Sequence, residues 1–113
     1  MDNFQPFRPS GSTSVIPAQP GTAPSATLMG SGLSGDVAYL VYNPGAIDCW
    51  MGYGPTSTVA QSNSVIPIIG TPSAALPVPG GSLQTFTLVG RQFFSGITQL
   101  GSCSVFVTPG QGA

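Results

Sequence analysis

Apolar and polar residues alternate along short runs from residue 36 onward, and this alternation predicts β-strands. The clearest run is SLQTFTLV, over residues 82–89. Its odd positions, from Leu83 to Val89, share one face, and its even positions, from Gln84 to Leu88, share the other. One face of such a strand is expected to pack on a core while the other meets solvent.

Similar runs bounded by glycine and proline predict further strands at residues 36–42, 46–53, 58–60, 64–69, 75–78, 92–98 and 102–108. The turn sequence Asn43-Pro44-Gly45 predicts that the first two of them pair as a hairpin. Glycine and proline interrupt the windows in which a helix would fit, so no helix is expected. The expected fold class is all-β: an antiparallel β-sandwich, jelly-roll-like, over residues 36–113.

The same alternation predicts the core. A slip of one residue in register exchanges the two faces of a strand, so the set depends on the assigned register. The positions assigned to the core are Val37, Tyr39, Val41, Ile47, Cys49, Met51, Ile66, Ile68, Phe86, Leu88, Phe94, Ile97, Cys103, Val105 and Val107.

Residues 1–35 follow neither the helical nor the strand period and are rich in Pro, Gly and Ser. Each proline favours extended backbone at its own position and at the residue before it. Two alternatives are open: a disordered tail, or an extended N-terminal arm that becomes ordered on a neighbouring subunit. A plain linker needs no apolar residues, so the arm is favoured by Phe4, Phe7, Val15, Ile16, Leu28 and Met29.

Charged residues make up only 4% of the chain, with a net charge of -1 and no histidine, while 41% of the residues are hydrophobic. A soluble domain usually has roughly a quarter charged residues. A chain this apolar is expected to collapse and pack, and its near-zero net charge favours association. Two arginines, Arg8 and Arg91, make no basic patch, so neither nucleic acid nor an anionic membrane is an expected partner.

The residue types needed for common catalytic sites are missing. Without His or Lys there is no Ser–His, Cys–His or Ser–Lys pair, so no enzyme is expected. Asp36 and Asp48 would form a carboxylate pair only if they faced each other across the expected hairpin, and otherwise each lies at a strand end or turn. The GxGxxG spacing in residues 30–35 has no strand before it and no helix after it, which indicates a hinge.

Two cysteines, Cys49 and Cys103, are either reduced and buried or joined in a disulfide between strands. Two cysteines without histidine fall short of a zinc-binding set, so no metal and no other cofactor is expected. No stretch reaches the roughly 20 apolar residues that span a bilayer, and MDNFQPFRPSGS at the start has no pattern of an export signal.

Two further residues are candidates for an interface. Strand alternation puts Trp50 and Met51 on opposite faces, so if Met51 faces the core Trp50 faces outward. An outward Trp would anchor a partner, or would pack under a loop or the arm of its own chain. Arg91 is a candidate for pairing with an aspartate, for stacking on an aromatic ring, or for contacting a partner.

Two segments carry a resemblance to a known class of proteins. One is YLVYNPGAIDCWMGYG, at residues 39–54, in which an asparagine ends a strand before a turn. The other is PVPGGSLQTFTLVGRQFFSGITQLGSCSVFVTPGQG, at residues 77–112, with a Pro-Gly start, an FSGIT segment, an apolar strand and a Gly-x-Gly end. Over its last two thirds the chain resembles small virion structural proteins of tailed bacteriophages, of the capsid cement or decoration class.

The resemblance implies a viral structural protein with a jelly-roll-like β domain that sits on a capsid lattice and binds across subunit joints. It also implies a homo-oligomer (dimer or trimer), the major capsid protein or other virion subunits as partners, and assembly into the virion in the host cytoplasm. Two alternatives stay open: a tail, baseplate or fibre component, and a carbohydrate- or ligand-binding β module. For the last, the stacking platform would be Trp50, Tyr39, Tyr42 and Tyr53.

Overall fold

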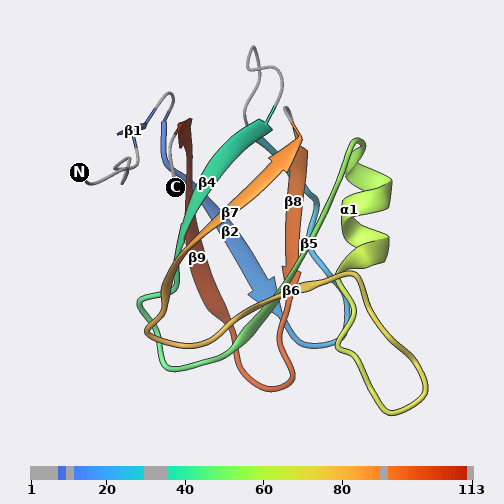
Figure 1. Ribbon diagram of the computed structural model, residues 1–113. Coiled ribbons are helices and arrows are strands. Elements are labelled where there is room, and N and C mark those ends of the chain that lie inside the picture. Colours follow the sequence, from blue (N-terminus) through green and yellow to red (C-terminus); the bar gives the residue numbers. More distant parts are fainter. Residues whose placement is uncertain (1–7, 10–11, 30–35, 90–91, 112–113) are drawn as a thin grey trace.

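The computed structural model of the 113-residue chain describes residues 8–9, 12–29, 36–89 and 92–111 (Figure 1). These residues form nine strands and one short helix. In chain order the elements are β1 (Arg8–Pro9), β2 (Ser14–Gln19), β3 (Thr27–Met29), β4 (Asp36–Tyr42), β5 (Cys49–Gly54), α1 (Ser57–Asn63), β6 (Leu76–Val78), β7 (Leu83–Val89), β8 (Gln92–Ile97) and β9 (Cys103–Gln111).

All of the strands belong to one sheet, which curls until it is nearly closed into a barrel (Figure 1). The strand order is β6-β5-β8-β2-β9-β4-β7, with β1 paired to β9 and β3 paired to β8. The pairs are antiparallel except for a short parallel contact between β2 and β8. The predicted all-β class is therefore confirmed, and the described strands form a single strongly curved sheet.

The expected hairpin of residues 36–42 and 46–53 is wrong. β4 pairs with β7 and β9, whereas β5 pairs with β6 and β8 on the far side of the barrel. The buried Asn43 explains the difference, because its side-chain Nδ2 donates to the carbonyl oxygens of Ile47, at 2.9 Å, and Val78, at 3.1 Å. The turn sequence thus becomes a wide loop fastened to the end of β6, and it leads the chain away from β4.

The short strand expected at residues 58–60 is also wrong, because α1 occupies this segment. Thr56 caps the helix: its side-chain oxygen accepts a hydrogen bond from the backbone N–H of Val59 at 3.3 Å. No glycine or proline lies within the helix sequence STVAQSN, so the helix needs only this cap and a surface to pack on. Ala60 provides the buried contact, against the glycines of β5.

The expected division at residue 35 does not hold for the part of the N-terminal region that the structure describes. β2 lies between β8 and β9, and β3 pairs with β8 (Figure 1). β2 keeps a strand period of two, with Ile16 and Ala18 buried. Its proline, Pro17, is accommodated because the ladder to β8 begins only at the next residue. These strands are part of the barrel.

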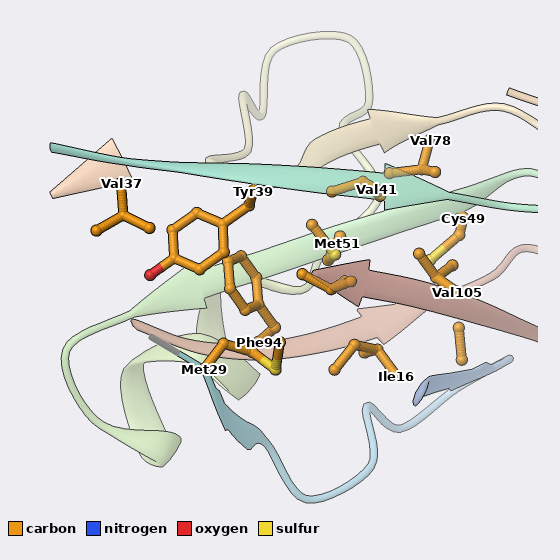
Figure 2. Packing of buried hydrophobic residues seen from close by; sticks show 12 residues of the cluster. Ile16, Met29, Val37, Tyr39, Val41, Cys49, Met51, Val78, Phe94 and Val105 are labelled. Atoms are coloured by element: carbon orange, nitrogen blue, oxygen red, sulfur yellow. The ribbon is translucent and has the colours of Figure 1, made fainter. Parts of the chain in front are cut away.

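The core fills the inside of the curved sheet, around Phe94 and Tyr39 (Figure 2). Eight predicted core residues are fully buried: Val37, Tyr39, Val41, Cys49, Met51, Phe94, Val105 and Val107. The prediction that Ile68 belongs to the core is wrong, since this residue lies at a turn and is 67% exposed. The predicted residues that are only half-buried are Ile47, Ile66, Phe86, Leu88, Ile97 and Cys103. Core residues that the alternation missed are Ile16, Ala18, Met29 and Val78.

Candidate interaction surface

The outward face of four adjacent strands carries a continuous row of apolar side chains, here called the outer row. It consists of Val15 on β2, Phe106 on β9, Tyr42 on β4 and Leu83 on β7. The row is continuous because register places Val15 opposite Phe106, Phe106 opposite Tyr42, and Tyr42 opposite Leu83. Alternation along each strand puts the core residues on the other side, so the strands that bury the core also expose the row.

The outer row is open to solvent and free of charge. Val15 is 48% exposed, Tyr42 45% and Leu83 62%. The rings of Tyr42 and Phe106 lie with centroids 6.4 Å apart. Beside them is a shallow groove of about 360 Å³, which is lined by these two rings and by Leu83, Thr13, Leu40 and Thr108. Every residue that lines this groove is uncharged.

Such a face is suited to binding another protein surface. Fully burying one large apolar side chain contributes about 1.5–3 kcal/mol. A partner that covered the partly exposed members of the row would therefore gain several kcal/mol from them. Docking would desolvate no charge, which removes a common cost of interface formation. The curved sheet fixes the backbone of the four strands, so binding here requires no ordering of the main chain.

A second exposed apolar feature is the loop between α1 and β6. Ile68 and Thr71 flank a two-residue turn. The backbone N–H of each donates to the carbonyl oxygen of the other, at 3.2 and 2.9 Å. Gly70 has φ +83°, a left-handed backbone conformation that glycine adopts without strain. Ile69 at the tip is completely exposed.

The structure shows that some of the interface residues predicted from the sequence are exposed and that others are buried. Val15 lies in the outer row, and Leu28 on β3 is 37% exposed. Trp50 is half-buried on the face of β5 opposite the buried Met51, as the alternation predicts.

The structure corrects the predicted interface at Ile16 and Met29. Both side chains are buried in the core of their own chain, so neither is available to a partner. Phe4, Phe7 and Arg91 lie outside the described residues, as does the segment 30–35 that was expected to be a hinge. Sequence reasoning missed Phe106, Tyr42 and Leu83 as members of one surface. Their common face follows from long-range strand pairing, which no local pattern reveals.

The expected aromatic platform for a sugar does not form. Tyr39 is fully buried and packs edge-to-face on Phe94 at 5.0 Å. Tyr42, on the same strand, points to the opposite face. Tyr53 packs inward against Phe94 at 6.5 Å. The tyrosines therefore do not share one surface on which a sugar ring could stack.

The carboxylates do not meet either. Asp36 begins β4 and pairs with Val89, whereas Asp48 lies beyond the loop that follows the far end of the same strand. Asp48 accepts a hydrogen bond from the backbone N–H of Gly80 at 2.9 Å, so it holds a turn. Among the described residues, no group of three or more His, Cys, Asp or Glu is placed to hold a metal ion. No helix in the described part of the chain is both long enough and apolar enough to cross a membrane.

A hollow of about 600 Å³ lies between α1, the loop after it and the segment that joins β2 to β3. Its lining consists of small polar and apolar residues and includes no titratable side chain. Gln61 is already engaged, because its Nε2 donates to the carbonyls of Ala23, at 3.3 Å, and Pro24, at 3.1 Å. The hollow offers neither acid–base chemistry nor a charged ligand site.

Neither a protein-family model nor any curated protein or solved structure matches this chain. The functional argument therefore depends on the surfaces and side chains described above. Of these, the outer row is a continuous apolar surface that the described strands leave exposed.

Cys49 and Cys103 are free thiols that lie within hydrogen-bonding contact of each other. Burial, and then the nearby Cys103 thiol, raise the pKa of Cys49 to about 12, from an ordinary value of 9.0. Burial also raises the pKa of Cys103, and the negative charge of Asp48 adds to the effect. Both thiols stay protonated at neutral pH, which makes them poor nucleophiles.

The raised pKa of Cys49 makes the free energy of unfolding decrease at alkaline pH. The folded-state pKa of Cys49 lies above the unfolded value, so its contribution is complete below pH 9 and is lost as the pH rises toward 12. We expect the free energy of unfolding to fall by up to about 1.4 kcal/mol per pH unit above that point. Denaturant titrations under reducing conditions on both sides of pH 9 measure this slope. The Cys49→Ala variant should show a shallower slope, and an equal slope would contradict the assignment.

Proposed function

We propose that this chain is a structural virion protein that binds across capsid subunits and stabilises the shell, in the manner of cement or decoration proteins. The observation that carries the proposal is the uncharged outer row across β2, β9, β4 and β7. The proposal includes the jelly-roll-like arrangement of that class, and it includes a reaching N-terminal arm only ahead of β1, because β2 and β3 belong to the barrel. Phe4 and Phe7 would be the contacts of such an arm.

The mechanism follows from a rigid barrel with an apolar face. Each copy would bury its outer row on the shell, and the Ile69 loop would add a separate point of contact. Repetition over a lattice increases the effective affinity, because one bound contact holds the next nearby. A protein that binds only the assembled shell stabilises it by mass action. The absence of His and Lys from the chain is compatible with this role.

Copy number tests the proposal directly. The chain would be purified in the assembly that contains it, and its copies would be counted by quantitative mass spectrometry and located by cryo-electron microscopy. Hundreds of copies on a closed shell are the expected result. A few copies at one vertex would indicate a tail, baseplate or fibre component instead. Absence of any co-purifying particle would overturn the virion role and favour a free binding module.

The outer row gives a residue-level test on the same particles. Replacing Tyr42 and Phe106 by serine (Tyr42→Ser with Phe106→Ser) removes both rings from the row. Loss of two central apolar contacts should weaken binding to shells from which the chain has been removed by about 30-fold or more. Val59→Ser on α1 is the control, since Val59 is 38% exposed but lies away from the row. Equal binding of the double variant and the control would show that another surface makes the contact.

A further inference from the structure

The two edges of the curved sheet are treated very differently by this fold. At one edge, β6 has only three residues and contains Pro77, which cannot donate a hydrogen bond to an added strand. Beyond the end of β6, side chains at the end of α1 form hydrogen bonds with backbone groups of β5. The N–H of Gly52 donates to Ser64 Oγ at 3.1 Å, and the Tyr53 carbonyl accepts from Asn63 Nδ2 at 2.9 Å. This edge is closed to further strands.

The other edge is β7, and among the described residues no proline, bulge or further strand protects it. β7 has seven residues, and its pairing with β4 runs from Asp36↔Val89 to Tyr42↔Leu83 without a bulge. Its sequence, LQTFTLV, contains no charge, no proline and no glycine. Within the described residues β4 is the only strand that pairs with it, and its other side pairs with no described strand. Phe86 and Leu88, on its inner face, remain half-exposed.

Natural proteins guard free edges with lysine, proline, bulges or very short strands, because an open edge pairs with any available strand. The β6–β5 edge of this chain uses two of these devices, and β7 uses none. We propose that β7 pairs in antiparallel orientation with β7 of a second copy, joining two barrels across a two-fold axis. Pairing by strand addition supplies main-chain hydrogen bonds along the whole edge.

A second copy fits this edge for reasons of register and symmetry. With the axis at Phe86, the Phe86 side chains of the two copies face each other on the inner side. On the outer side, Thr85 of each copy faces Thr87 of the other, a favourable pair of β-branched residues. No like charges meet. Because each copy uses its one open edge, and its other edge is closed, the assembly stops at a dimer instead of growing into a fibre.

The dimer does not depend on the virion role, and it is tested on the purified chain alone. Light scattering after size exclusion should give twice the 11.4 kDa mass of the chain. The variant Thr85→Lys with Thr87→Lys places like charges opposite each other at both outer pairs, and we expect its dimer dissociation constant to rise about 30-fold or more. The matched control adds the same charge on exposed positions of α1, with Thr58→Lys and Ser62→Lys, and should remain a dimer.

Charge complementation makes the result specific to this edge. Mixing the lysine variant with Thr85→Glu/Thr87→Glu chains should restore a dimer that contains one of each. Hydrogen exchange of the intact chain is a check that needs no variant: protection of residues 83–89 should increase with protein concentration. The proposal is overturned if the intact chain is a monomer, if it forms open fibres, if the lysine variant dimerises like the control, or if exchange at β7 is independent of concentration.

Discussion

Replacing Phe94 by alanine is expected to destabilise the fold by about 3–5 kcal/mol, a large part of the total stability of a small domain. Phe94 is fully buried on β8, with the ring of Tyr39 at 5.0 Å and that of Tyr53 at 6.5 Å. Alanine would leave a cavity at the point where β3, β5 and β4 converge on the core (Figure 2). Denaturant unfolding followed by near-ultraviolet circular dichroism measures the loss.

Phe106→Ala is the matched control for this prediction. It removes the same atoms from the outer row, where the ring is only half-buried and faces away from the core. Its cost should be well under half that of Phe94→Ala, because less buried area is lost and water can fill the space. Similar losses in the two variants would mean that the outer row is part of the stabilising core and not a surface kept for a partner.

Replacing Gly52 by alanine is expected to cost about 3 kcal/mol, at the top of the usual range for overpacking. A Cβ at this position would lie closer than 3.0 Å to the Ala60 carbonyl oxygen and to the Ser64 backbone nitrogen. These are main-chain atoms at the end of α1, so the whole helix would have to move. The move would also break the hydrogen bonds of Ser64 Oγ, which accepts from Gly52 N–H at 3.1 Å and donates to the Ala60 carbonyl at 2.9 Å.

Gly45→Ala provides the comparison for Gly52→Ala. The only atom near a Cβ at Gly45 is Asn43 Oδ1, at 3.7 Å, which is ordinary contact. Its N–H donates to that same oxygen at 3.2 Å, and alanine keeps this donor. We expect a change within about 0.5 kcal/mol, measured by the same unfolding transition. If both variants lost equal stability, close packing of α1 on β5 would not be the cause.

The candidate surface was only partly predictable from the sequence. The apolar residues of the Pro-rich segment predict contacts with a partner, and one of them, Val15, lies in the outer row. Ile16, its neighbour, was identified on the same ground and is buried. Composition alone cannot distinguish the two, because their faces depend on β2 being a strand of the barrel. The prolines that suggested an arm concealed that strand.

Local sequence pattern predicts the all-β class and the faces of β4 and β7, and the composition shows that the chain contains no His and no Lys. These properties are local: a period of two decides which side chains share a face, and missing His and Lys remove their reactions wherever the chain folds. Tertiary structure decided that β4 pairs with β7 and β9 instead of β5, that β2 enters the sheet, and that residues 57–63 form a helix. Pairing depends on burial between residues far apart in the chain. The outer row and the open edge of β7 exist only once that pairing is made.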